Sequence, residues 1–221
     1  MGRRFLITGT DSRVGKTTVG CALGFAFRAR GMRVGVMKPV ETGCAEVGGE
    51  LQALDASALA LAAGSQLPME LICPYRYRSP LAPTAVADAD GLPPPDLANI
   101  ARCFREIAAQ NDAMLVESAG GLATRLNSDA DFADLAALLN LEVIVVIGNR
   151  PGCLNSTMLT LKHAERHRLT IAGHILCDID PGSSPAMEAN ADSLITFTNE
   201  RYLGRMRYRE PLSKTIVEKL L

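Results

Sequence analysis

The sequence has almost no net charge and lacks a long apolar run. Its 221 residues carry a formal net charge of -1, so no long-range field draws the chain to nucleic acid or to an anionic membrane. No apolar run approaches the ~20 residues that a bilayer span requires. The apolar run near the amino terminus is only as long as a strand, so we expect no signal peptide. These absences argue against a membrane protein and against a nucleic-acid-binding protein.

Closely spaced cysteine pairs are also missing. The six cysteines are scattered without a CxxC motif, at Cys21, Cys44, Cys73, Cys103, Cys153 and Cys177. In a chain without an export signal, such cysteines are typical of reduced thiols in the cytosol. We therefore expect a cytoplasmic protein.

The composition is that of an ordinary globular protein, with 48% hydrophobic and 21% charged residues. A chain of this length is long for one small domain and short for two. We therefore expect one domain that spans residues 1–221.

Strand-like apolar runs alternate with segments of helical periodicity. The expected strands are Arg4–Thr8, Arg33–Met37, Met114–Val116, Glu142–Gly148 and Thr170–Cys177, and the expected helices are Gly15–Arg30, Leu51–Ala63, Asp96–Gln110 and Ser156–His167. The unbroken Val/Ile run within 142–148 indicates burial on both faces, as in a parallel sheet. The proline-rich stretch Arg76–Pro95 is interpreted as a long irregular crossing. The alternation predicts an α/β fold with a doubly wound, mostly parallel sheet flanked by helices.

One loop follows the first expected strand and reads GTDSRVGKTT, Gly9 to Thr18. Backbone N–H groups of such a loop and of the next helical turn point at one spot, where the helix dipole favours an anion. Lys16 adds a positive charge, and Thr17 offers a hydroxyl to a metal ion. The pattern predicts a phosphate-binding loop with Mg²⁺, as in P-loop NTPases. Gly9 stands one position earlier than the usual spacing, so a turn that only caps a helix stays possible.

Three charged residues accompany this loop. Lys38 ends the second strand and could neutralise charge during phosphoryl transfer, or it could be a surface lysine. Glu117 ends another strand before Gly120 and could place a carboxylate near Mg²⁺, or it could only begin a loop. The local sequence favours Asp55 as a helix N-cap.

Six segments together resemble one family. In order they read GTDSRVGKT, KPVETG, DASAL, SPLAPTAVA, VESAGG and GCLNSTMLT, and they resemble dethiobiotin synthetase from about residue 5 to about residue 180. The early glycine of the loop is a feature of that family. The resemblance implies an ATP-dependent carboxylation and ring closure of 7,8-diaminononanoate with CO₂. The implied intermediates are a carbamate and a carbamic–phosphoric anhydride, and the product is dethiobiotin.

The resemblance also implies roles for individual residues. The catalytic residues would be Lys38 and Lys16, and the Mg²⁺ ligands would be Thr17, Asp55 and Glu117. The nucleotide would contact Arg13, Val14, Gly15, Lys16, Thr17, Thr18, Asp55, Glu117, Gly120, Cys177 and Asp178. The substrate would contact Ser12, Lys38, Thr42, Gly152, Cys153 and Asn155. The last three would receive the substrate carboxylate across the interface of a homodimer.

Four positions depart from the family pattern. Ser118 stands where glycine is frequent, and Thr84 where histidine is frequent. Cys177 replaces the asparagine that reads adenine, although a thiol cannot make the paired hydrogen bonds of an amide. Gly204 begins a segment that lacks the family's G-x-x-P. The sequence therefore leaves the base preference open.

The same loop also occurs in proteins with other functions. A partition-type P-loop switch is disfavoured because Asp11 stands where that class carries a second lysine. A paralogue with an altered base pocket, acting as a nucleotide-dependent switch or regulator, stays possible.

Two further features receive structural interpretations. His163 and His167 have a spacing that could hold zinc, but no third ligand is evident, so we predict surface histidines. The basic stretch Arg201–Glu210 is predicted to be a solvated face or a wall of the nucleotide pocket.

Overall fold

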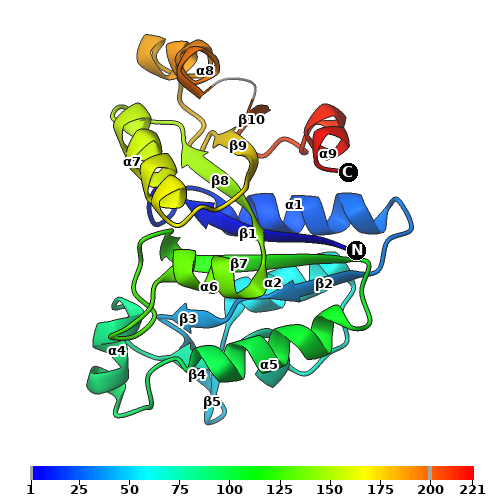
Figure 1. Ribbon diagram of the computed structural model, residues 1–221, viewed down its shortest axis with the longest axis vertical. Coiled ribbons are helices and arrows are strands. Elements are labelled where there is room, and N and C mark those ends of the chain that lie inside the picture. The colour runs from blue at the N-terminus through cyan, green and yellow to red at the C-terminus, as the bar shows by residue number, and fades with distance from the viewer. Residues whose placement is uncertain (1, 199–200) are drawn as a thin grey trace.

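A six-stranded sheet forms the centre of the molecule. The structure is a computed structural model that describes residues 2–198 and 201–221. The strands are β1 (Arg3–Gly9), β2 (Val34–Met37), β7 (Ala113–Gly121), β8 (Glu142–Gly148), β9 (Ile171–Cys177) and β10 (Tyr202–Met206). Their order is β10-β9-β8-β1-β7-β2, and each neighbouring pair is parallel (Figure 1). The prediction of a mostly parallel sheet is confirmed.

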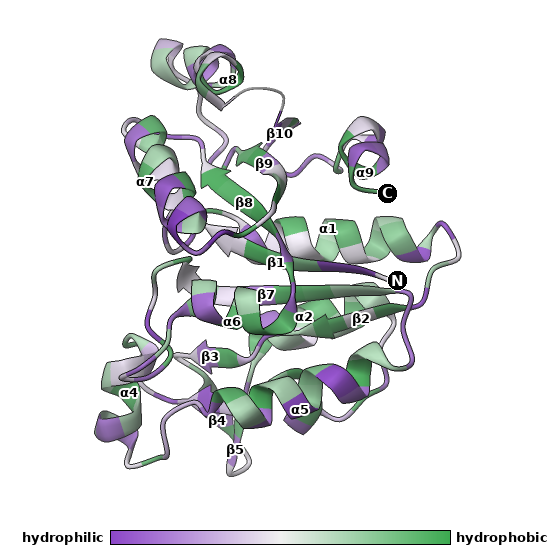
Figure 2. Cartoon of the chain, in the orientation of Figure 1, coloured by the Kyte–Doolittle hydropathy of each residue, from purple (hydrophilic) through white to green (hydrophobic). Residues whose placement is uncertain are grey.

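Helices cover both faces of this sheet. One layer contains α1 (Lys16–Arg28), α2 (Leu54–Ala63) and α9 (Lys214–Leu220), and the other contains α5 (Leu97–Ala108), α6 (Phe132–Leu139), α7 (Cys153–Arg166) and α8 (Pro185–Thr198). Successive residues of β1 enter opposite cores, because side chains alternate along a strand. Leu6 packs into the core of the second layer, and Phe5 and Ile7 into that of the first. Figure 2 shows hydrophobic residues along β8 and over much of β7. The doubly wound prediction is confirmed.

Smaller elements surround the carboxyl ends of the central strands. Strand β3 (Val40–Thr42) pairs with β6 (Tyr75–Tyr77), and β4 (Ala45–Val47) pairs with β5 (Glu50–Gln52) in a hairpin. Two short helices, α3 (Met69–Ile72) and α4 (Pro83–Asp90), lie in the same part of the chain.

Several predicted boundaries were wrong. Helix α2 begins at Leu54 rather than Leu51, because residues 50–52 pair in the hairpin. Helix α7 begins at Cys153, three residues earlier than predicted. The stretch 76–95 is not irregular throughout, since it contains α4, whose first residue is a proline in the position where the fixed φ of proline suits a helix.

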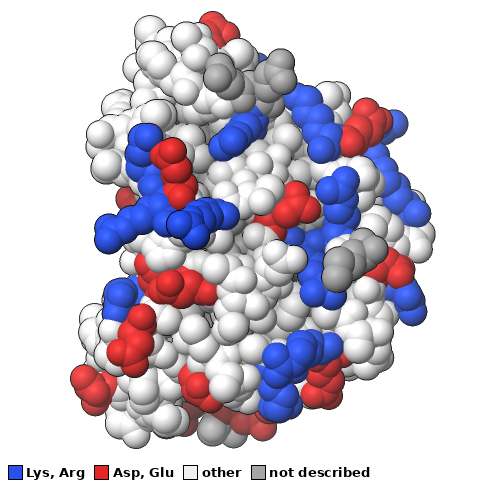
Figure 3. All heavy atoms as spheres, in the orientation of Figure 1, with Lys and Arg blue, Asp and Glu red and all other residues white. Residues whose placement is uncertain are grey.

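The surface carries charges of both signs, and the cysteines are unpaired. Positive and negative side chains are interspersed over the face shown in Figure 3. Among the described residues, no helix is long and apolar enough to cross a bilayer. All six cysteines are free thiols.

Candidate active site

The predicted phosphate loop connects β1 to α1. A Cβ on Gly9 would lie 2.6 Å from the Cγ2 of Val14, so the early glycine is required by close packing. Arg13 and Gly15 have φ angles of 55° and 95°, which turn the backbone into the helix that begins at Lys16. No side chain caps this helix at Gly15, so its first N–H groups remain available to an anion. The geometry of this loop therefore suits a phosphate group.

Lys16 folds back over this loop. Its Nζ donates a 2.9 Å hydrogen bond to the carbonyl oxygen of Asp11. Burial lowers the pKa of Lys16 to about 8, against the attraction of the Glu117 carboxylate. A bound polyphosphate would favour the charged ammonium, because an anion nearby raises a lysine pKa.

A cluster of charges around the buried Lys38 lies beside the loop. The Nζ of Lys38 lies 2.5 Å from Oε1 of Glu117 and 2.9 Å from Oδ2 of Asp55. The hydroxyl of Thr17 donates to the same Oε1 of Glu117 at 2.9 Å. Burial opposes the charge of Lys38, but the carboxylates of Glu117 and Asp55 outweigh it and raise the pKa of Lys38. Lys38 is thus a buried ammonium, and its interpretation as a solvated surface lysine was wrong.

The two acids occupy positions that differ from those predicted. Glu117 lies inside β7, which continues to Gly121 because that residue pairs with Gly9 of β1. Asp55 is not the N-cap of α2, since the N-cap is Ala53. The cap is supplied by Glu41, whose two carboxylate oxygens accept hydrogen bonds of 3.0 Å from the N–H groups of residues 55 and 56. Asp55 is therefore free to pair with a cation.

The donor set of this cluster fits Mg²⁺. A hydroxyl and two carboxylates are the oxygen ligands that this ion prefers. The Oε2 atom of Glu117 is buried, and among the described residues no hydrogen-bond partner is found for it. A buried carboxylate oxygen without a partner carries a desolvation cost that a cation would remove.

A cavity of about 890 Å³ joins the loop and the cluster. Its walls include most of the predicted site residues, namely Ser12, Arg13, Gly15, Lys16, Thr17, Thr18, Lys38, Thr42, Asp55, Glu117, Gly120, Cys177 and Asp178. Four predicted residues do not line it: Val14, Gly152, Cys153 and Asn155. The side chain of Val14 is fully buried, so only its backbone could contact a nucleotide.

Cys177, one of the residues that depart from the family pattern, lines the cavity together with Asp178. A Cβ on Gly15 would lie 2.5 Å from the Sγ of Cys177, so this thiol packs against the loop backbone. Burial, with the nearby charge of Asp178, raises the pKa of Cys177 to about 11. The carboxylate of Asp178 already accepts hydrogen bonds from Asn149 Nδ2 at 2.7 Å and from Arg205 Nε at 2.9 Å. The two residues line the cavity, but much of the acceptor capacity of the Asp178 carboxylate serves contacts within the protein.

The basic stretch after β9 contributes to the same cavity. Residues 206–209 line the cavity, and Arg205 also binds Glu188 of α8 through Nη1 at 2.8 Å. Of the two interpretations of this stretch, the structure supports a pocket wall.

The segment at the start of α7 lies outside the cavity. Gly152 and Asn155 are exposed, whereas Cys153 is 2% exposed and packs into the core. The N–H of Cys153 donates to the carbonyl oxygen of Arg150 at 3.2 Å. Asn155 is therefore the residue of this segment whose side chain can reach another molecule.

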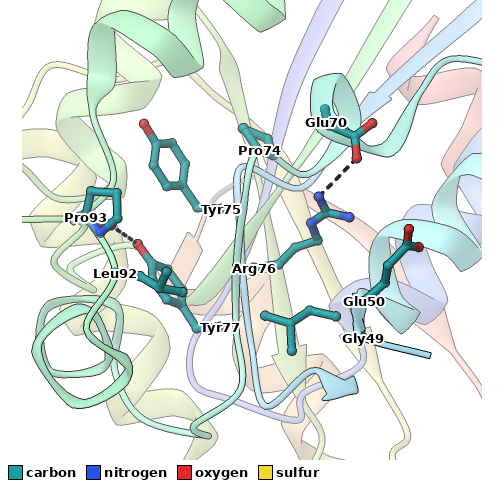
Figure 4. Close-up of a pocket in the computed structure, with 10 residues that line it drawn as sticks. Gly49, Glu50, Glu70, Pro74, Tyr75, Arg76, Tyr77, Leu92 and Pro93 are labelled. Carbon is teal, nitrogen blue, oxygen red and sulfur yellow. Dashed lines mark hydrogen bonds and ion pairs between the residues drawn. The ribbon is translucent and has the colours of Figure 1, made fainter. Parts of the chain in front are cut away.

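A second cavity of about 440 Å³ lies between β5, β6 and the segment after α4 (Figure 4). Tyr77 donates to the carbonyl oxygen of Pro93 at 2.7 Å, and Arg76 binds Glu70 at 3.1 Å. None of the predicted site residues lines this cavity. The cavity at the phosphate loop is therefore the candidate active site.

Sequence reasoning missed the contacts by which two buried polar residues support the site. Glu41 orients Asp55 through the helix cap, and the hydroxyl of Ser118 lies 3.0 Å from Oγ1 of Thr8 beneath the loop. The hydroxyl of Ser118, which stands where the family has glycine, thus has a buried hydrogen-bond partner on the neighbouring strand. Neither contact has a local sequence signal, because 14 residues separate Glu41 from Asp55 and 110 separate Ser118 from Thr8.

The chain is similar to proteins of known class. A family model described as an AAA domain matches residues 3–215. A protein of Anaeromyxobacter dehalogenans named ATP-dependent dethiobiotin synthetase is 41% identical over 211 residues, which cover 96% of this chain and 88% of that protein. A protein with the same name from Anaeromyxobacter sp. strain K is 39% identical with the same coverage.

Solved structures show a related fold at low identity. A plasmid partition protein from Borrelia burgdorferi has a TM-score of 0.58 at 13% identity, over 100% of this chain and 96% of that chain. A signal recognition particle protein from Aeropyrum pernix, in complex with GDP, has a TM-score of 0.60 at 14% identity, over 99% of this chain and 46% of that chain. These likenesses support the P-loop fold alone.

Proposed function

The chain belongs to the dethiobiotin synthetase family, and we propose that the cavity at the phosphate loop is where it carries out that family's reaction. The protein is an ATP-dependent ligase that forms dethiobiotin. The observation that carries the site assignment is the convergence of Lys16, Thr17, Lys38, Asp55 and Glu117 on one cavity. The alternative of a nucleotide-dependent regulator is not favoured, because identity of about 40% extends over 96% of the chain.

The phosphate loop holds the triphosphate of ATP in this proposal. Backbone N–H groups of Arg13–Thr18 and the ammonium of Lys16 surround the phosphates, as the free amino terminus of α1 favours. Ser12 also lines the cavity, and in this proposal it contacts the substrate. Asp178, Cys177 and Gly120 contribute to the walls around the rest of the nucleotide.

Thr17, Asp55 and Glu117 would hold Mg²⁺. Such an ion would neutralise charge that develops on the transferred phosphoryl group. The carboxylates proposed for it are also the partners of Lys38. Mg²⁺ and the ammonium of Lys38 would share the negative charge of the two carboxylates. Part of the hydrogen-bonding capacity of Lys38 would then be available to the substrate.

The reaction joins three reactants in a balanced sequence. One amine of the diamine adds to CO₂ and loses a proton, which gives a carbamate. A carbamate oxygen attacks the γ-phosphorus of ATP, so that a carbamic–phosphoric anhydride forms and ADP leaves. The second amine attacks the carbonyl carbon, loses a proton and expels phosphate, which takes up that proton; this step closes the cyclic urea. Carbamate and γ-phosphate are both anions, so Lys38 and Lys16 serve by positioning and charge stabilisation rather than by strong base catalysis. Thr42, on the cavity wall near Lys38, would contact the substrate.

A homodimer would complete the substrate site. Gly152, the N-cap of α7, has a φ of 86° and offers no side-chain cap. The N–H of Cys153 is bound to Arg150, but the next N–H groups of the first turn and the exposed amide of Asn155 suit a carboxylate. Because this segment does not line the cavity of its own chain, we propose that it serves the cavity of a partner subunit. We also propose a single-domain subunit that works in the cytoplasm, where its free thiols stay reduced.

Phosphate release tests the proposed reaction directly. With ATP, Mg²⁺, bicarbonate and diamine all present, the purified protein should release phosphate, and omission of any one component should abolish release. Chelation with EDTA should act like omission of Mg²⁺. Hydrolysis without the diamine would instead indicate a switch. Parallel assays with ATP, CTP and GTP would define the base preference that Cys177 and Asp178 allow.

Replacement of Lys38 tests its catalytic role. We expect Lys38→Ala to retain ATP binding, measured calorimetrically, because the loop and Lys16 remain. Turnover should fall about 10²–10³-fold, the usual effect of losing one charge-stabilising group. Lys162→Ala, which removes an exposed lysine from α7, should turn over normally. Normal turnover of Lys38→Ala would show that the assignment is wrong.

Mixed dimers test the shared site. Lys38→Ala should inactivate the cavity of its own subunit, and Asn155→Asp should repel the substrate carboxylate bound to the partner. A heterodimer purified with two different tags would have one site with both residues intact. We expect it to show about half of the wild-type turnover, as two-fold symmetry requires. A heterodimer no more active than the two variant homodimers would contradict the shared site.

A further inference from the structure

A cluster of two histidines and two aspartates joins α6 to α7. Asp131 precedes α6, and Asp134 lies in its first turn. His163 and His167 lie one turn apart on α7, with ring centroids 4.6 Å apart. The Nε2 of His163 lies 2.9 Å from Oδ2 of Asp131, and the Nδ1 of His167 lies 3.3 Å from Oδ1 of Asp134. Asp131 is therefore a candidate third ligand that the sequence did not reveal, and the two histidines are partly exposed, at 24% and 23%.

The helix cap fixes the direction of the carboxylates. Oδ1 of Asp131 accepts hydrogen bonds from the N–H groups of Ala133 and Asp134, at 2.8 and 3.0 Å. Oδ2 of Asp134 accepts from the N–H of Asp131 at 2.9 Å. Each aspartate thus uses one oxygen for the capping box and turns the other toward an imidazole. Such pre-orientation by neighbouring hydrogen bonds is typical of built metal sites.

We propose that Asp131, His163 and His167 form a site for a transition-metal ion of the Zn²⁺ class, with Asp134 beside it in contact with His167. Ligand atoms of the first three residues all lie within 4.8 Å of one another. Zinc–ligand bonds of about 2.0–2.2 Å would bring them to roughly 3.3 Å, which small side-chain rotations can provide. Two imidazoles with carboxylates suit zinc or cobalt, whereas Mg²⁺ takes oxygen ligands.

The site is open to solvent and separate from the catalytic cavity. The histidine side chains are 24% and 23% exposed, so an ion can enter, while that of Asp131 is 7% exposed and held in place. None of the four residues lines the cavity at the phosphate loop. The ion would tie the start of α6 to the last turns of α7. Its role would be structural, because a ligand that binds only the folded state stabilises that state.

Cobalt binding tests the proposal. The full-length protein, stripped with a chelator and then kept in excess Mg²⁺ to fill oxygen-ligand sites, would be titrated with Co²⁺. We expect one equivalent to give the visible absorption of a four-coordinate ion. His163→Gln and His167→Gln should each weaken binding by at least about tenfold. Glu165→Gln, between the two histidines on α7, should bind as the wild type does.

Thermal unfolding supplies a second measurement. Zn²⁺ should raise the Tm of the wild type and of Glu165→Gln, but not that of the histidine variants. Circular dichroism without metal would show whether each variant folds. Two results would overturn the proposal: no Co²⁺ band in the wild type, or equal binding by the wild type and His163→Gln. Either would mean that hydrogen bonds alone hold the cluster together.

Discussion

The ammonium of Lys38, buried between Glu117 and Asp55, is the interaction on which the site depends. A lysine at this depth is tolerated only because two carboxylates balance its charge. The same carboxylates, joined by the hydroxyl of Thr17, form the oxygen cluster proposed for Mg²⁺. The two carboxylates therefore favour a cation at this position beside the phosphate loop. That cation can be the ammonium of Lys38 or a metal ion.

The sheet brings these groups together. Lys38 follows β2 and Glu117 lies within β7, which separates β2 from β1 and its phosphate loop. Parallel strands place such positions at one edge, where ligands of open α/β sheets bind. Asp55 reaches the same edge on α2, whose amino terminus is held by Glu41. Long-range pairing, rather than any one segment, produces the site.

The sequence predicted the parallel sheet and the phosphate loop, because apolar runs and glycine positions are local signals. It also identified Lys38, Asp55 and Glu117, through the resemblance to a family that has the same motifs in the same order. It could not show that Glu41 caps α2, or that Asp131 faces His163, since both contacts join residues distant in the chain. It misjudged the extent of β7 because a strand continues wherever its neighbours pair, whatever its own propensity.

A double-mutant cycle tests the central charge balance most directly. Lys38→Met, Glu117→Gln and the double variant would be unfolded with urea in the absence of nucleotide and divalent ions. Each single change should cost about 3–5 kcal/mol, because it leaves a buried charge without its partner. The double variant should be more stable than the sum of the two losses implies, by at least about 1 kcal/mol. The exposed pair of Lys162 and Glu165, 2.8 Å apart, provides the control cycle and should show no coupling. If the losses of unfolding free energy in Lys38→Met and Glu117→Gln simply add up in the double variant, the account is contradicted.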